Sequence, residues 1–277
     1  MKTIALQVYG LPKDKNAIKK VLKDSGISRI EVNIADVRDV EWYREFLENE
    51  ENITASGVHF NLSLLEGVEH KGVKFIKEYG AKTLIIPAAL EENSLAWPLI
   101  YLRRFPKFYQ LVRELVDRFQ FKGMRRKIAG TKTNQLSYFL ENFWLSLCDE
   151  LKKFKNTGVA LGYHNHGIEF EKFGMEKTIY ELLDQKLDQE IFFQMDITNL
   201  LMSGHYSVEL IQKYIHRIKS FHLRIEGPGT EGFYQELFKN HPTIFENKEM
   251  VIELKENSAD EMIKRNLWWK NLINSVS

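Results

Sequence analysis

Residues 162–170, Gly-Tyr-His-Asn-His-Gly-Ile-Glu-Phe, place two imidazoles and a carboxylate directly after the apolar run 159–161. Three later apolar runs end in the same way, at Asp196, His222 and Glu253. Imidazole nitrogens and carboxylate oxygens are the ligands that divalent cations take from proteins. If these four runs are strands whose ends meet, the pattern predicts one shared metal site.

Each of these residues also has an ordinary explanation. An Asp after a strand often caps the next helix, a lone His is often a hydrogen-bonded core residue, and Glu253 can face solvent at a strand edge. Their occurrence on consecutive strands favours joint ligation. No Cys lies nearby, which excludes a zinc-finger type of site. Manganese is the first candidate ion, and magnesium, cobalt and catalytic zinc stay open.

Short apolar runs alternate with helical patterns along the whole chain. The expected strands are 4–9, 29–33, 55–61, 82–87, 159–164, 191–196, 218–222 and 249–254. The expected helices are 13–24, 40–48, 68–79, 135–156, 175–185, 207–216, 231–239 and 258–273. Strand–helix units in this number predict the α/β class and a (β/α)8 TIM barrel, which brings the carboxyl ends of all its strands to one mouth. The second choice is an open doubly wound sheet, but Gly10 stands alone where a glycine-rich dinucleotide turn belongs.

A long insert after strand 4, about residues 88–133, interrupts this alternation. Inserts on this side of a barrel often cover the active site, so the segment is interpreted as a lid or an oligomer contact. A surface helix with a solvated basic loop explains it equally well. The chain is expected to be a single domain over 1–277.

Bulk composition excludes some classes of partner. The chain has 39 Lys+Arg against 38 Asp+Glu, so no overall field favours nucleic acid or an acidic membrane surface. The apolar stretch at 4–9 is too short for a signal peptide, and no run is long enough to span a membrane. Cys148 is the only cysteine, which fits a reducing, cytoplasmic location.

The His-Asn-His segment with the following Glu169-Phe170 resembles the sugar phosphate isomerase/epimerase family of the xylose-isomerase-like TIM barrel superfamily. The segments around Asp196 and His222 are similar to the strand-six and strand-seven segments of that family, where Asp and His bind metal. Glu253 falls where the strand-eight glutamate is expected. At the tip of strand five many relatives have Glu, where this chain has His164. Either His164 binds the ion or Glu169 reaches back, and Glu169 is favoured because a third carboxylate better neutralises the cation.

The resemblance implies a divalent-metal-dependent isomerase or epimerase of carbohydrate metabolism, acting on a keto-sugar or sugar phosphate through an enediolate. The implied metal ligands are Glu169, Asp196, His222 and Glu253. The implied catalytic residues are Glu253 as first base, with His164 or His166 as second. Arg224 and Asn165 would hold substrate oxygens, and His59 and Glu31 would line the pocket. The family also implies self-association, with a sugar or polyol as the small-molecule partner.

One departure from the family concerns the substrate. The family usually places an Asp shortly after the strand-seven histidine, following a Lys. Here the acid is missing and Arg224 replaces the Lys. Loss of a β-hydroxyl instead of proton return would make the chain a sugar or inosose dehydratase, and a degenerate site would make it a non-catalytic sugar-binding barrel. A DNA-repair endonuclease shares the barrel, but its extra metal ligands are sparse here.

Overall fold

The computed structural model describes residues 3–8, 14–34, 37–50, 52–60, 75–87, 145, 148–149, 151–152, 158–170, 172, 176–254 and 258–275. The predicted insert at 88–133 and most of the predicted helix 135–156 lie outside these ranges. Leu145, Cys148 and Leu151, which belong to that predicted helix, are helical where they are described. No helix among the described residues is long and apolar enough to cross a membrane.

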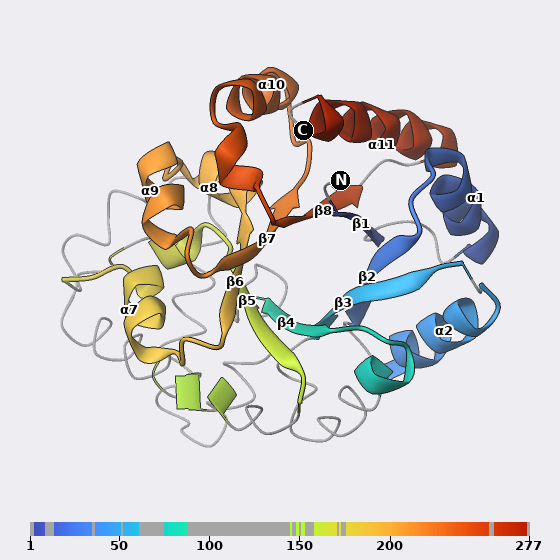
Figure 1. The fold of residues 1–277 in the computed structure, drawn as a ribbon, viewed down its shortest axis with the longest axis horizontal. Helices are drawn as coiled ribbons and strands as arrows, with labels where there is room; N and C mark the ends of the chain where they lie inside the picture. Colours follow the sequence, from blue (N-terminus) through green and yellow to red (C-terminus); the bar gives the residue numbers. More distant parts are fainter. Residues whose placement is uncertain are drawn as a thin grey trace, which may run out of the picture.

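Eight parallel strands form a closed barrel in chain order, and the last strand pairs with the first (Figure 1). They are β1 (Thr3–Val8), β2 (Arg29–Ile34), β3 (Thr54–Phe60), β4 (Thr83–Pro87), β5 (Ala160–His164), β6 (Phe192–Asp196), β7 (Ile218–Leu223) and β8 (Glu249–Leu254). The closed order confirms the predicted (β/α)8 barrel, because an open doubly wound sheet would leave two strands unpaired at its edges.

Helices surround this barrel on the outside (Figure 1). The described helices are α1 (Lys15–Ser25), α2 (Val37–Glu48), α7 (Ile179–Lys186), α8 (Ile197–Ser203), α9 (Val208–Tyr214), α10 (Thr230–Asn240) and α11 (Ala259–Asn274), with 3-10 turns η5 (Ile168–Phe170) and η6 (Pro242–Phe245). Residues 75–78 are helical as well. Helix α8 was not predicted, because its residues continue the apolar run of β6 without an intervening turn signal.

Local capping determines where several helices begin and end. Asp14 accepts hydrogen bonds from the first backbone amides of α1, and Gly26 ends the helix in the left-handed conformation. Thr178 and Glu181 form a complete capping box at α7, so this helix starts at 179 and not at the predicted 175. Ser258 caps α11 as its sequence pattern predicts.

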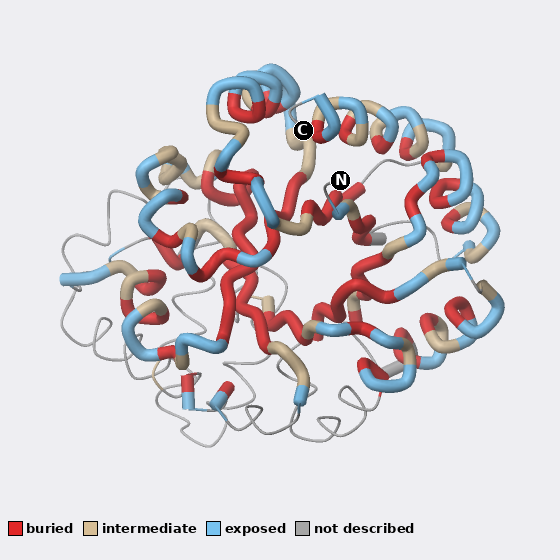
Figure 2. Tube along the Cα trace, in the orientation of Figure 1, coloured by how far each residue is buried: buried red, intermediate tan, exposed pale blue. Residues whose placement is uncertain are grey.

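The buried residues lie on the strands and on the inner faces of the helices (Figure 2). All five residues of β6 are buried, as expected for a parallel strand covered on both faces. Apolar side chains fill the layer between strands and helices, and Trp269 of α11 packs edge-on against Tyr234 of α10. The barrel interior at the carboxyl ends of the strands is different, because polar side chains are buried there.

Gly162 of β5 gives a test of the barrel packing. A Cβ atom at this position would lie 2.5 Å from the Phe192 ring of the neighbouring strand. We therefore expect Gly162→Ala to lower the free energy of unfolding by about 1–3 kcal/mol, as overpacking does in other cores. Urea denaturation followed by circular dichroism measures this change.

Gly232 supplies the matched control for that substitution. It lies in helix α10, and a Cβ atom there would meet no heavy atom within 4 Å. Gly232→Ala is expected to raise stability by about 0.5–1 kcal/mol, because Ala is the better helix former. Equal effects of the two substitutions would contradict the packing described for β5 and β6.

Candidate functional site

Strand register brings the polar residues of the sequence analysis to one level of the barrel. Asp196 on β6 lies opposite His222 on β7. On the strands that follow β7 round the barrel, Gln7 on β1 lies opposite both Glu31 on β2 and Glu253 on β8. All five side chains are at most 7% exposed. The predicted convergence of strand ends is therefore present for Asp196, His222 and Glu253.

His222 lies at the centre of this group with its ring nitrogens turned to two sets of neighbours. Its Nδ1 atom is 3.5 Å from Asp196 Oδ2 and 3.6 Å from Glu253 Oε2. Its Nε2 atom is 3.8 Å from Glu31 Oε1. Both nitrogens are buried, and neither has a hydrogen-bond partner among the described residues. A buried polar atom without a partner is costly, so this imidazole fits a site that receives a ligand.

The two carboxylate oxygens of Asp196 make different contacts. Oδ1 accepts a hydrogen bond of 2.6 Å from the backbone amide of Asn199 and so caps helix α8. Oδ2 faces the centre, 3.8 Å from His164 Nε2. Burial opposes the charged form, but His222 and then Arg224 lower the pKa of the Asp196 carboxyl below its ordinary value. Oδ1 thus has the helix-cap role, while Oδ2, which also accepts a 2.9 Å hydrogen bond from Asn199 Nδ2, is the oxygen that could bind an ion.

Gln194 connects three of the buried polar residues, and the sequence analysis gave it no role. Its Nε2 atom donates to Glu31 Oε2 at 2.6 Å. Its Oε1 atom is 2.7 Å from His59 Nε2 and 2.8 Å from His164 Nδ1. A carboxylate only accepts, so the amide nitrogen must face Glu31 and the amide oxygen must face the imidazoles. Both imidazoles consequently donate N–H to Gln194.

This arrangement leaves His164 ready to act as a ligand. Burial and the charges of His222 and His59 hold the pKa of His164 well below its ordinary value, so the ring is neutral. With the proton on Nδ1 and directed at Gln194, the lone pair is on Nε2, which faces Asp196. Metal-binding histidines commonly have their second nitrogen held by such a hydrogen bond.

Glu31 and His59 form a buried ion pair beside this group. His59 Nε2 is 2.9 Å from Glu31 Oε1, which also accepts a 3.0 Å hydrogen bond from Gln7 Nε2. Burial opposes ionisation of both groups, but each charge stabilises the other. The pKa of the Glu31 carboxyl is thus lowered and that of the His59 ring is raised.

Glu169, the favoured strand-five ligand of the sequence analysis, is placed differently. Its Oε1 atom accepts a 2.7 Å hydrogen bond from the Tyr163 hydroxyl, and Oε2 accepts one of 2.9 Å from the His166 backbone amide. Burial raises the pKa of this carboxyl. Two compact groups of ligand atoms are present among the described residues: Glu31, His59 and His222, and His164, Asp196 and His222. Glu169 and Glu253 belong to neither group, but Glu253 Oε2 lies 3.6 Å from His222 Nδ1, whereas both oxygens of Glu169 are engaged elsewhere. The geometry therefore favours the alternative, His164, over Glu169.

Asn165, the neighbour of His164, joins the ends of β5 and β6. Asn165 accepts a 3.0 Å hydrogen bond from the Asp196 backbone amide and donates to the Asp196 carbonyl. These contacts give Asn165 a positioning role, since its side chain is engaged with backbone and not directed at the centre. The His166 ring lies 5.2 Å from the His164 ring, at the edge of the site.

Arg224, the residue directly after β7, lies beside the buried carboxylates. Its side chain is 13% exposed, and its Nη1 atom donates to Asp196 Oδ2 at 3.0 Å and to Glu253 Oε2 at 3.2 Å. Its Nη2 atom donates to Asn199 Oδ1 and its Nε atom to Glu226. The guanidinium thus lies against two of the carboxylates, Asp196 and Glu253, that the family resemblance implies as metal ligands.

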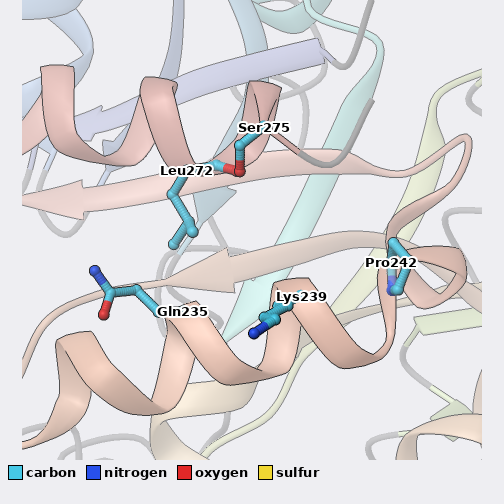
Figure 3. A pocket seen from close by; sticks show the side chains of 5 residues that line it. All are labelled: Gln235, Lys239, Pro242, Leu272 and Ser275. Carbon is cyan, nitrogen blue, oxygen red and sulfur yellow. The ribbon is translucent and has the colours of Figure 1, made fainter.

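A pocket elsewhere on the molecule is unrelated to this centre. It lies between α10 and α11 and is lined by Gln235, Lys239, Pro242, Leu272 and Ser275 (Figure 3). None of these residues belongs to the group around His222. The candidate site is therefore identified by its buried ionisable groups and not by this cavity.

Known structures share this architecture over nearly the whole chain. A sugar phosphate isomerase/epimerase from Parabacteroides distasonis ATCC 8503 is 17% identical, with a TM-score of 0.60 over 98% of this chain and 97% of the other. The IolI protein with a binding zinc atom is 11% identical, with a TM-score of 0.58 over 100% and 99%. These proteins and this chain share the (β/α)8 barrel fold. At these identities the comparison establishes the fold alone.

Three further findings come from the comparisons with known proteins. No family model matches the sequence. An inosose dehydratase from Clostridium perfringens is 29% identical over 89 residues, which are 30% of this chain and 29% of the dehydratase, so the match spans less than a third of that relative. An AP endonuclease of family 2 from Brucella melitensis also shares the fold, at 12% identity and a TM-score of 0.52 over 98% of this chain and 99% of the other. The fold by itself therefore does not separate sugar chemistry from DNA repair.

Proposed function

We propose that this chain is a divalent-metal-dependent isomerase or epimerase of a keto-sugar or sugar phosphate. The observation that carries the proposal is His222, whose two buried nitrogens lack hydrogen-bond partners among the described residues and face ionised or ionisable carboxylates. The ligands we propose are His164 Nε2, Asp196 Oδ2, His222 Nδ1 and Glu253 Oε2.

The donor set supports a divalent ion of the manganese type. Two imidazoles and two carboxylates combine neutral nitrogen with charged oxygen, and they suit manganese, cobalt or catalytic zinc better than calcium. Two carboxylates would balance the charge of one divalent ion. Gln194 supports this ligand set without belonging to it, because its hydrogen bond with His164 Nδ1 fixes the tautomer of that ring.

A divalent ion held there would supply Lewis-acid polarisation of a substrate carbonyl and an adjacent hydroxyl. The chain itself must then move a proton at the carbon beside the carbonyl, which gives an enediolate. Glu253 is the first proposed base, as in the sequence analysis. The His59–Glu31 pair is a second source of proton transfer, since it is ionised, buried and adjacent to His222. Return of the proton to the other carbon isomerises the sugar, and return to the opposite face epimerises it.

A dehydratase is the second candidate, because the partial match to inosose dehydratase points to it. The same enediolate would then expel a β-hydroxyl and yield an unsaturated product. A barrel that binds sugar without turnover is the third candidate. DNA repair is the least supported, since the net charge is only +1 and a nucleic-acid site needs concentrated positive charge.

The chemistry is tested with keto-sugars and inososes incubated with the purified protein and Mn²⁺ in deuterated water. We expect solvent deuterium at a carbon beside the carbonyl, detected by NMR, even where net conversion is slow. Loss of water from an inosose would favour the dehydratase. Metal binding without exchange on any substrate would favour the sugar-binding barrel. Asp196→Asn serves as the background control, because it removes a proposed ligand.

A further inference from the structure

We propose that Arg224 is a built-in competitor of the divalent ion, and this rests on the proposed metal site. One guanidinium atom, Nη1, donates to Asp196 Oδ2 and to Glu253 Oε2. The ion would bind the same two carboxylate oxygens. A cation is therefore already present at the place where a second cation must bind. We infer that metal binding displaces Nη1 from these carboxylates.

The distances support competition between Arg224 Nη1 and the ion for the same two carboxylate oxygens. Nη1 is 3.0 Å from Asp196 Oδ2 and 3.2 Å from Glu253 Oε2, closer than His222 Nδ1 is to either atom. A metal–oxygen bond is shorter still, at about 2.0–2.6 Å. Two positive charges this close repel each other strongly in a buried site, even when they contact different lone pairs of the same carboxylate oxygens. Binding of the ion and retention of the Nη1 contacts therefore oppose each other.

Arg224 also has contacts that would hold it after displacement. Its Nε atom pairs with Glu226, whose side chain is 43% exposed and so lies toward the rim. Its backbone is fixed by Thr198, which bonds both the Arg224 amide and carbonyl. A rotation of the outer part of the side chain would release Nη1, together with the Nη2 contact to Asn199 Oδ1, while the ion pair of Nε with Glu226 remains. We thus infer a metal-free state, in which Nη1 neutralises the two carboxylates, and a metal-bound state, in which Nη1 is withdrawn from them and Nε keeps its pair with Glu226.

The alternative is that Arg224 only stabilises the fold by neutralising two buried carboxylates. Both accounts predict that Arg224→Gln lowers the thermal midpoint of the metal-free protein, because buried carboxylates lose their partner. Only competition predicts that the same variant binds metal more tightly. Metal affinity is therefore the readout that separates them.

The experiment is isothermal titration of Mn²⁺ into the wild type, Arg224→Gln, Arg224→Lys and the control Arg44→Gln. Arg44 lies on the outer helix α2, where it pairs with Glu41, and its removal tests the general effect of losing one positive charge. We expect Arg224→Gln to bind Mn²⁺ about 10–100-fold more tightly, because substitutions next to metal ligands commonly change metal affinity by such a factor. Arg224→Lys should fall between it and the wild type, and Arg44→Gln should match the wild type. If Arg224→Gln does not fold without metal, Arg224→Lys carries the test, and tighter binding than the wild type is the expected result.

The outcomes separate this inference from the proposed function. Equal or weaker binding by the Arg224 variants, with a wild type that binds Mn²⁺, overturns the competition and leaves the metal site intact. Binding by Arg224→Gln alone supports the competition but contradicts a metal-dependent wild type. Binding by neither protein overturns both.

Discussion

Asp196→Asn is expected to abolish tight metal binding while it keeps the cap of helix α8, although Arg224 and Asn199 lose a carboxylate acceptor. The Asn oxygen can still accept from the Asn199 amide, so the cap of α8 is retained. The charged Oδ2 atom that faces His164, His222 and Arg224 is lost. We expect more than about a 100-fold loss of Mn²⁺ affinity, because even residues outside the ligand shell commonly change it 10–100-fold. Isothermal titration measures the affinity, and the thermal midpoint measures the fold.

Asp196→Ala is the matched comparison, because it removes the ligand and the cap together. Its stability should fall below that of Asp196→Asn by about 1 kcal/mol or more from the lost cap. An Asp196→Asn protein that keeps wild-type metal affinity would show that Asp196 is a helix cap and nothing more.

Gln194→Leu is expected to be among the most destabilising substitutions in the barrel. The volumes are similar, so no large cavity forms, but Glu31 Oε2 and His164 Nδ1 lose their Gln194 partner in a buried site, while His59 keeps only its contact with Glu31. Each unpaired buried group costs about 1–3 kcal/mol, so a loss of about 3 kcal/mol or more in the free energy of unfolding is expected. Urea denaturation provides the measurement.

The control is Gln212→Leu on the exposed face of α9, which should change stability by less than about 0.5 kcal/mol. A comparable, small effect of Gln194→Leu would mean that the network around Glu31 and His59 is not formed. Metal affinity adds a second readout, since the tautomer of His164 is no longer fixed in Gln194→Leu.

The strands were predictable because parallel barrel strands are buried on both faces and so appear as continuous apolar runs. Their predicted and observed bounds agree to within about one residue wherever both are described, as in β7 and β8. Helix α8 escaped prediction because Asp196 is at once the last residue of a strand and the cap of the next helix. A single residue with two structural roles leaves no separate signal in the sequence.

The site was predictable in part for the same reason. Asp196, His222 and Glu253 follow apolar runs, and the barrel brings them to one place. Gln194 was overlooked although it lies two residues before Asp196, and the period of two places both side chains on one face of β6. The pairing of Glu169 with Tyr163 depends on how the turn η5 folds back, which spacing along the chain does not reveal.

The most direct test is anomalous diffraction from crystals of this protein soaked in a manganese salt. The account predicts a single strong peak inside the barrel, bonded to His222 Nδ1 and His164 Nε2 and to one oxygen each of Asp196 and Glu253, with Arg224 Nη1 withdrawn from Asp196 and Glu253. Peaks confined to surface carboxylates, with His222 still unligated and Arg224 still between Asp196 and Glu253, would contradict it.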